Sequence, residues 1–529
     1  MGESEQGIVL AVDHSLDVEK TIMKNRLNRR DFLKLAGLLP LSVAVPRLLQ
    51  TVGTSPALQE KPKNVIVVVF DAFSAYDISL YGYDRETTPV ISSLAKKAVV
   101  YHNHFAGGNF TSPGTASLLT GVLPWTHRAF NLNGTVADPY ATQNIFGAFK
   151  DYYRIAYTHN GFANNLLRQF QNELDELIPK ESLLLDSYDR VISALFKNDE
   201  DIATISRVRS LKVNEEGYAY SLFLSHIYEN LQERKIEQFK PLFPRGLPIA
   251  GPLNPFLLET AMGAIGKRLT EIPKPFVGYF HLMPPHQPYR TSSEFFDVFK
   301  GDGFAPAEKP LDILAKKDVR NIPVKRTEYD EFILYCDKEF GRLYNLLDSS
   351  GLLDDTWLVL TSDHGEMFER GIVGHGSKVL YQPVVRIPLM IFEPGRKTGV
   401  DVYEYTSAID LLPTLAHLAG QNIPDWTEGV ILPPYADVDH DRNLYVLQAI
   451  DNAKYAPLTQ ASAILVRENY KLHDYFGYPE TNGDELVRLF DIKADPEEMT
   501  DLFPSRKGVA SELLNELKSK LTEINEPYL

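Results

Sequence analysis

A stretch of hydroxyl residues beside a proline could provide an oxygen nucleophile in this chain. In Phe110–Gly121, Thr111 and Ser112 precede Pro113, and the small residues and leucines that follow could begin a helix. A hydroxyl at a helix N-terminus lies among unpaired backbone N–H groups, at the positive end of the helix dipole. That position suits attack on an anionic ester. Either hydroxyl could instead be an ordinary N-cap, and the other motifs of the chain favour Thr111 as the nucleophile.

Two acidic residues follow apolar runs that are typical of buried strands. Val65–Phe70 is a continuous run with Asp71 directly after it, and Thr356–Thr361 is soon followed by Asp363 and His364. Such runs indicate strands buried on both faces of a parallel sheet, and ligands gather at the carboxyl ends of these strands. Asp71, Asp363 and His364 are therefore candidate metal ligands, although Asp71 taken alone could simply cap the next turn.

Further cationic side chains occur in two loops. A third apolar run, Phe276–Phe280, ends in His281 and a proline-rich loop that contains His286, and a glycine-rich loop contains His375 and Lys378. Each histidine could be packed as a structural residue. Together with a metal-activated hydroxyl, however, they predict a site that surrounds a tetrahedral anion with positive charge.

The apolar and helical segments that surround these residues predict an α/β fold. We expect a central, mostly parallel sheet flanked by helices, because the apolar strands alternate with segments of helical period. A chain of 529 residues is too long for one compact core. We predict a leader and linker over residues 1–60, a catalytic domain over 61–435 with a helical insertion at about 162–268, and a C-terminal α+β subdomain over 436–529.

The composition of the chain limits which partners it can bind and which residue types can hold a metal. The net charge of −16, from 54 basic and 70 acidic residues, argues against nucleic acid as the main partner. A small anionic substrate remains compatible, because it responds to the local field of its site. Cys336 is the only cysteine, so neither an intramolecular disulfide nor a four-cysteine zinc site can form. Carboxylates, imidazoles and hydroxyls favour zinc or manganese over calcium or magnesium.

The N-terminal region resembles a twin-arginine export signal. Asn28–Lys34 contains paired arginines followed by Phe-Leu-Lys, and Leu35–Val45 is a short, weakly hydrophobic run. This run is too short to be a fixed transmembrane anchor, and Ser55–Ala57 offers a small-residue cleavage site. We expect export to the periplasm or the cell surface. The alternative is a basic amphipathic helix on a cytosolic protein.

The ordered motifs from about Asn64 to the C-terminus resemble the sulfatase-like branch of the alkaline phosphatase superfamily. The resemblance implies the alkaline-phosphatase-like fold, a central sheet between helical layers with a smaller C-terminal α+β subdomain. The segments that carry it are Thr111–Gly121, His286–Tyr289, Ser362–Glu366, Gly374–Gly376, Arg386–Leu389, Asp410–Thr414, Tyr470–Leu472 and Leu489–Pro496.

Three departures from the sulfatase pattern affect the chemistry. Sulfatases carry a cysteine or serine that is oxidised to formylglycine, where this chain has Thr111. The motif's arginine is replaced by Thr115, and the usual pair of aspartates is Asp71 followed by Ala72. We therefore expect no formylglycine. Threonine is the nucleophile in the nucleotide pyrophosphatase, phosphoethanolamine transferase and phosphoglycerol transferase branches of the superfamily.

The resemblance also implies roles for the site residues. One divalent ion would be held by Asp71, Thr111, Asp363 and His364. The side chains that would neutralise the non-bridging oxygens of the transferred group, or protonate the leaving group, are His286, His375 and Lys378. Asn109 and His281 are expected to contact the substrate; His281 could also belong to a second metal site, for which the sequence offers no matching carboxylate.

We therefore expect a metal-dependent hydrolase that cleaves a small phosphate ester, of phosphodiester or phosphonate type, through a covalent intermediate on Thr111. Two alternatives from the same superfamily stay open: a sulfatase that acts without formylglycine, and a phosphoethanolamine or phosphoglycerol transferase. A third alternative is an inactive exported binding module. The absence of several transmembrane segments favours a hydrolase over a membrane transferase.

Overall fold

The computed structural model describes residues 61–185, 227, 230, 231, 234, 236–251, 254–315 and 321–529, and residues 61–529 form one compact unit. The predicted leader and residues 186–226 of the predicted insertion lie outside the described residues. Within the described ranges, no helix is both long and apolar enough to cross a membrane. The division into domains at residue 435 stays a prediction.

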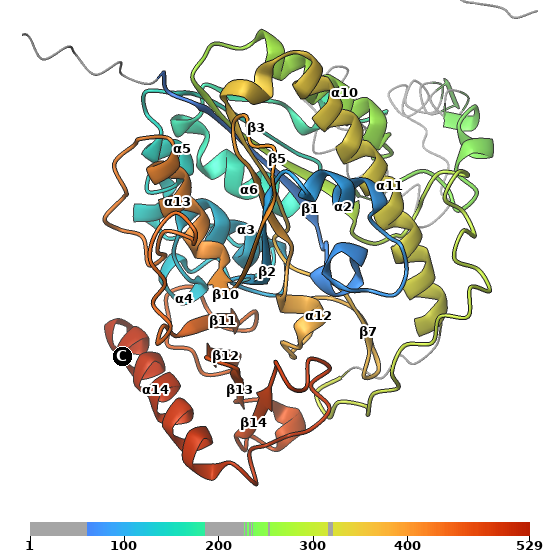
Figure 1. Cartoon of the computed structure of the whole chain (residues 1–529). Helices are drawn as coiled ribbons and strands as arrows, with labels where there is room; N and C mark the ends of the chain where they lie inside the picture. The colour runs from blue at the N-terminus through green and yellow to red at the C-terminus, as the bar shows by residue number, and fades with distance from the viewer. Residues whose placement is uncertain are drawn as a thin grey trace, which may run out of the picture. The chain divides into compact units, whose positions relative to one another are not determined.

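A mostly parallel sheet forms the centre of the fold (Figure 1). It has eight strands in the order β10-β2-β9-β6-β1-β5-β3-β4. Its strands are β1 (Asn64–Asp71), β2 (Val99–Phe105), β3 (Tyr153–Thr158), β4 (Glu176–Leu177), β5 (Phe276–Pro285), β6 (Thr356–Thr361), β9 (Leu389–Phe392) and β10 (Val400–Ser407). Only β9 runs antiparallel to its neighbours. The α/β prediction is confirmed, and the three apolar runs with chemistry at their ends, β1, β5 and β6, are adjacent.

Helices cover both faces of this sheet. The side chains of β1 point alternately to the two faces and pack into two apolar cores. Val65, Val67 and Val69 pack into one core, and Ile66, Val68 and Phe70 pack into the other. The first core includes α3 (Thr111–Thr120), α6 (Gly161–Gln169) and α13 (Leu411–Leu418). The second includes α2 (Pro89–Ala95), α10 (Leu258–Glu271) and α11 (Ile322–Ser349). Figure 1 shows the two helical layers on either side of the strands.

The C-terminal region forms a second, antiparallel sheet. It consists of β11 (Leu444–Gln448), β12 (Ala461–Arg467), β13 (Tyr470–Phe476) and β14 (Leu486–Asp491), paired in chain order. The last helix, α14 (Lys507–Asn525), shares an apolar core with this sheet. The predicted α+β character of the C-terminal region is thus confirmed.

Shorter elements join these layers. The short helices are α4 (Pro124–His127), α5 (Ile145–Ala148) and α12 (Gln382–Val385). A hairpin of β7 (Met367–Glu369) and β8 (Ile372–Gly374) follows β6 and stands apart from the main sheet. In the region predicted to be helical, β4 adds an edge strand beside β3.

Candidate active site

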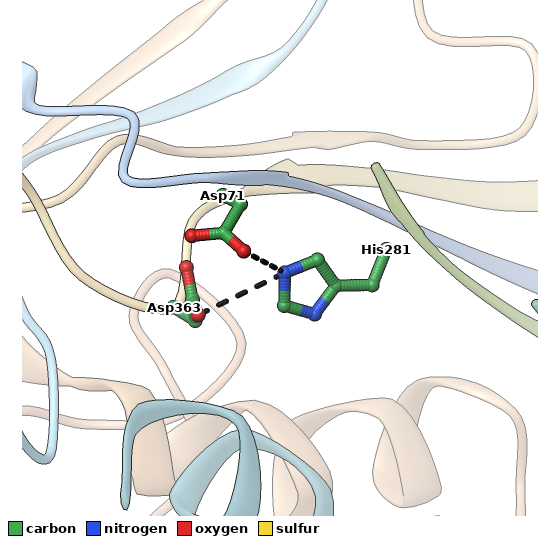
Figure 2. Close-up of side chains that lie close together, drawn as sticks. All are labelled: Asp71, His281 and Asp363. Atoms are coloured by element: carbon green, nitrogen blue, oxygen red, sulfur yellow. Dashed lines mark hydrogen bonds and ion pairs between the residues drawn. The ribbon is translucent and has the colours of Figure 1, made fainter. Parts of the chain in front are cut away.

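Asp71, His281 and Asp363 meet at the carboxyl ends of the three central strands (Figure 2). Asp71 is the last residue of β1, His281 lies on β5, and Asp363 follows β6. His281 Nε2 lies 3.2 Å from Asp71 Oδ2 and 3.8 Å from Asp363 Oδ2, and all three side chains are fully buried. The parallel register produces this arrangement, because β5 and β6 both pair with β1 and bring their ends to one edge of the sheet.

A second imidazole completes the cluster. His364 Nε2 lies 3.4 Å from Asp71 Oδ1 and 3.5 Å from Asp363 Oδ2. Nδ1 of His364 lies 2.9 Å from the carbonyl oxygen of Gly365, and this contact turns Nε2 toward the carboxylates. Glycine is needed at position 365, since a Cβ there would come within 2.0 Å of the Pro383 carbonyl oxygen.

Thr111 is the first residue of α3, and its hydroxyl faces this cluster. Thr111 Oγ1 lies 3.5 Å from His364 Nε2. The N-cap position belongs to Phe110, and neither Thr111 nor Ser112 occupies it. The alternative in which these hydroxyls are N-caps is therefore wrong. The helix can approach the end of β6 so closely because Gly114 has no side chain; a Cβ there would lie 2.2 Å from the backbone oxygen of Asp363.

Asn160 also belongs to the site, although its role was not predicted from the sequence. Its Nδ2 donates to Asp71 Oδ2 and, at 3.3 Å, to Thr111 Oγ1. Its Oδ1 accepts from the backbone N–H groups of Phe162 and Ala163, which makes Asn160 the N-cap of α6. The sequence signal was an asparagine directly before a helical segment. Only the fold shows that the other end of this amide reaches the nucleophile.

The buried charges of the cluster depend on one another. Burial opposes ionisation of Asp71, but the charge of His286 and hydrogen bonds from His281 and His364 hold its pKa well below the usual value. Burial and the charge of Asp71 raise the pKa of Asp363. Burial opposes the charged form of His364 as well, yet Asp363 and Asp71 raise its pKa to about 9. The two buried carboxylates thus favour a positive charge beside them, either on His364 or on a bound cation.

The residues present fit a divalent metal. Ligand atoms of Asp71, His281 and Asp363 all lie within 4.8 Å of one another, and Asp71 Oδ1 is buried with His364 Nε2 3.4 Å away. Two carboxylates with one or two imidazoles are a donor set that suits zinc or manganese. His281 faces Asp71 and Asp363, the carboxylates of the predicted first metal site, and a second metal site at His281 stays a prediction.

The two loop histidines predicted from the sequence, His286 and His375, lie beside this centre. The ring centroid of His375 is 4.3 Å from that of His364 and 4.7 Å from that of His286. Burial lowers the pKa of His375, although Glu366 acts in the opposite direction. The structure thus places His375 beside His364, and His286 beside His375.

Asn109 and Lys378 make contacts that the sequence did not indicate. Asn109 Nδ2 donates to the Ser377 carbonyl at 2.7 Å and so holds the loop that carries His375, while its Oδ1 is buried and unpaired. Lys378 Nζ lies 2.6 Å from both carboxylate oxygens of Glu480. In the structure this ammonium group pairs with Glu480. The predicted contact of Lys378 with the charge of the substrate stays a prediction.

Comparisons with known proteins agree with this architecture. Residues 63–421 match the Sulfatase family model, and residues 374–527 match the model of the N-sulphoglucosamine sulphohydrolase C-terminal region. A choline-sulfatase of Rhizobium meliloti is 32% identical over 247 residues, which cover 42% of this chain and 45% of that protein. An ulvan-active sulfatase of Formosa agariphila is 24% identical, with 89% of this chain and 83% of that protein covered.

Among solved structures, the phosphonate monoester hydrolase of Agrobacterium radiobacter superposes with a TM-score of 0.61 at 18% identity. The match covers 88% of this chain and 96% of that one. At this identity the likeness concerns the fold, and it places the present sheet and its flanking helices in a known architecture.

Proposed function

This chain belongs to the sulfatase family, whose members are ester hydrolases, and we propose that it hydrolyses a small sulfuric ester with Thr111 as the nucleophile. The observation that carries the proposal is the position of the Thr111 hydroxyl. It is free of any capping role and lies beside His364 and Asn160, at the edge of a buried carboxylate cluster. The sulfatase names of the curated relatives support sulfate over phosphate.

The donor set that would hold a divalent ion consists of Asp71, Asp363, His364 and His281, with Thr111 adjacent. When bound, such an ion supplies Lewis-acid stabilisation and lowers the pKa of a coordinated hydroxyl. Asn160 orients the Thr111 hydroxyl by donating to Oγ1, and the same amide holds Asp71. Zinc or manganese is the ion that we propose, from the mixture of oxygen and nitrogen donors.

The chemistry follows from a threonine that cannot become formylglycine, because its β-carbon carries a methyl group. In the first step, Thr111 Oγ1 gives up its proton and forms a bond to sulfur while the bond from sulfur to the alcohol oxygen breaks, and that oxygen takes up a proton. In the second step, water attacks sulfur, the bond from sulfur to Oγ1 breaks, and the Thr111 hydroxyl is restored. His286 and His375 are the nearby groups that can move these protons.

A phosphate or phosphonate ester is the second candidate, and the presence of threonine at position 111 is the observation that favours it. The experiment compares kcat/KM of the purified, metal-loaded chain on 4-nitrophenyl sulfate, 4-nitrophenyl phosphate, bis(4-nitrophenyl) phosphate and 4-nitrophenyl phenylphosphonate. The highest value on the sulfate supports the proposal, and a higher value on a phosphorus ester replaces it with the second candidate.

The remaining alternatives have outcomes of their own in the same assay. Transfer to an added alcohol in preference to water identifies a transferase. A metal-loaded protein that turns over none of the four esters identifies a binding module. Each of these results contradicts the proposed hydrolase.

We also propose that the protein is exported through its paired arginines. Arg29 and Arg30 lie outside the described residues, so the proposal rests on the leader motif alone. Replacing both arginines with lysine should leave the protein in the cytoplasmic fraction of an expressing bacterium. Unchanged export of that variant contradicts a twin-arginine route.

A further inference from the structure

We propose that a cavity beside the 3₁₀ helix η1 (Ala75–Asp77) binds a small carboxylate carried on a ring, with Arg386 holding the carboxylate and tyrosine side chains contacting the ring. The cavity has a volume of about 390 Å³, which lies within the range of roughly 300–1,000 Å³ that is usual for small-molecule sites. None of the described residues that line it belongs to the candidate active site. The proposal therefore concerns a second site and goes beyond the hydrolysis proposed above.

Segments that are far apart in the chain build this cavity. They include the loop after β1, the residue after α12, residues 304–307 and residues 496–497. The Ala75 N–H donates to the Arg386 carbonyl at 3.1 Å, and the Tyr76 hydroxyl donates to the Pro496 carbonyl at 3.3 Å. Because these hydrogen bonds join the walls to one another, the cavity keeps its shape without a ligand.

Ion pairs within the protein occupy two of the cations that line the cavity. Lys309 Nζ lies 2.7 Å from Glu369 Oε2 and 2.5 Å from Glu497 Oε2, and the Lys309 side chain is only 3% exposed. Arg326 Nη1 lies 3.5 Å from Asp77 Oδ1. The charges of Lys309 and Arg326 are therefore already balanced by acidic side chains, and neither is left to neutralise a ligand.

Among the described residues that line the cavity, Arg386 is the cation without an acidic partner. Its Nε donates to the His102 carbonyl at 2.9 Å, and within the same part of the chain the terminal nitrogens Nη1 and Nη2 have no acceptor. Burial lowers the pKa of this guanidinium, an unfavourable effect that a bound anion offsets. The two terminal nitrogens match the two oxygens of a carboxylate, which they can bind through parallel hydrogen bonds.

Aromatic rings form another part of the wall. The aromatic residues that line the cavity are Tyr76, Tyr81, Tyr83 and Phe304, and the Tyr83 and Phe304 rings pack edge-on with their centroids 5.1 Å apart. The three tyrosine hydroxyls already have partners in the protein, so the rings contribute apolar surface. The guanidinium carbon of Arg386 lies 5.9 Å from the centroid of the Tyr81 ring. A ligand ring can therefore contact aromatic surface next to the group that binds its carboxylate.

The charge balance of the cavity favours a ligand with a single negative charge. Glu369, Glu497 and Asp84 also line the cavity, and they repel a dianion such as phosphate or sulfate more strongly than a carboxylate. The unpaired guanidinium of Arg386 supplies one positive charge, which one carboxylate neutralises. Two kinds of compound carry a single carboxylate on a ring, namely aromatic acids and uronic acids.

Isothermal titration calorimetry of the full-length protein tests the site with two ring carboxylates and three controls. Benzoate carries its carboxylate on an aromatic ring and glucuronate on a sugar ring, whereas acetate lacks the ring, benzyl alcohol lacks the charge and inorganic phosphate lacks the ring and carries more charge. We expect benzoate or glucuronate to bind at least about tenfold more tightly than every control, because the charged hydrogen bonds and the ring contact both add to affinity. The tighter of the two identifies the kind of ring. Failure of both to bind, or equally tight binding of a control, overturns the proposal.

Variants at two positions locate the bound ligand. Arg386→Gln should weaken binding of the better ring carboxylate about 10- to 100-fold, the range for a hydrogen bond to a charged group, and Arg386→Lys should recover part of the loss. Ala305→Trp should fill the cavity from an exposed position on its wall and weaken binding without removing a charge. The matched control is Arg467→Gln, at an arginine outside the cavity that pairs with Glu512 at 2.7 Å. This control should leave the affinity unchanged.

Two outcomes contradict the assignment of the ligand to this cavity. Full affinity in a folded Arg386→Gln variant overturns it; if that variant does not fold, full affinity in Ala305→Trp does so. The titration is also repeated after divalent metals have been removed with a chelator. We expect no change in affinity, and loss of binding would place the ligand at the metal site and overturn the proposal. These titrations need no turnover of an ester, so the proposal and the proposed function can fail separately.

Discussion

Asn160 Nδ2 lies 3.3 Å from Thr111 Oγ1, while Asn160 Oδ1 caps α6 through the Phe162 N–H at 2.7 Å. The two ends of one amide thus connect the start of a helix to the nucleophile. Because Oδ1 accepts from two backbone N–H groups, the orientation of the amide is determined and Nδ2 must face the site.

We expect Asn160→Ala to lower both activity and stability. Loss of the cap should cost about 1 kcal/mol, and loss of the donor to Thr111 should lower kcat about 10- to 100-fold, within the range for a group that positions catalytic atoms. The control is Asn144→Ala, which removes an equivalent cap from α5 through the Phe146 and Gly147 N–H groups. The control should lose stability and keep its kcat; a similar kcat for both variants would rule out a role for Asn160 in the reaction.

Thr111→Ala should abolish turnover, because it removes the hydroxyl that is proposed to form the covalent intermediate. Thr111→Ser should retain part of the activity, since it keeps an oxygen at the first position of α3. The measurement is kcat on 4-nitrophenyl sulfate, with metal content determined in parallel to show that the site is still loaded. Near-normal turnover by Thr111→Ala would show that the nucleophile is a different group.

His281→Ala should weaken metal binding, because it removes an imidazole whose Nε2 faces both Asp71 and Asp363. Metal content after dialysis against a graded series of chelator concentrations gives the comparison. His286→Ala is the control, since that partly exposed residue lies outside the candidate ligand set. If His281 contacts only substrate and no metal, its loss would raise KM and leave metal content unchanged.

The Glu498 side chain should make the free energy of unfolding depend on pH. This fully buried carboxylate lies 2.8 Å from Lys471 Nζ and 3.2 Å from His473 Nε2. Burial raises its pKa, but these partners outweigh that effect and lower the pKa from 4.5 to about 2. A pKa depressed in the folded state stabilises the protein above pH 4.5, and the stabilisation is lost as the pH falls toward 2.

The size of this effect is roughly 3 kcal/mol from the pKa shift. Glu498→Gln should therefore melt well below the wild type at pH 7, and the difference should shrink between pH 4.5 and pH 2 in thermal unfolding curves. Glu497→Gln, at the neighbouring side chain that is 40% exposed, is the control. A melting difference that stays constant over this range would contradict the assignment.

Several features of the site could be read from the sequence because they depend on short segments. An apolar run followed by Asp71 or Asp363 predicts a buried strand with a carboxylate at its end. Thr111 at the start of a helix is a local feature of the same kind. The α/β fold, the mostly parallel sheet and these three site residues all follow from patterns within a few residues.

The contacts that complete the site depend on the fold. Asn160 reaches Asp71 across 89 positions of the chain, and His281 reaches Asp71 across 210. A sequence pattern does not reveal which strands become neighbours, so His281 had no visible carboxylate until β5 was placed beside β1. The residue pattern alone specifies the chemical groups and the strands that carry them. Which of these groups meet depends on the folded structure, because pairing between strands far apart in the chain sets the distances between them.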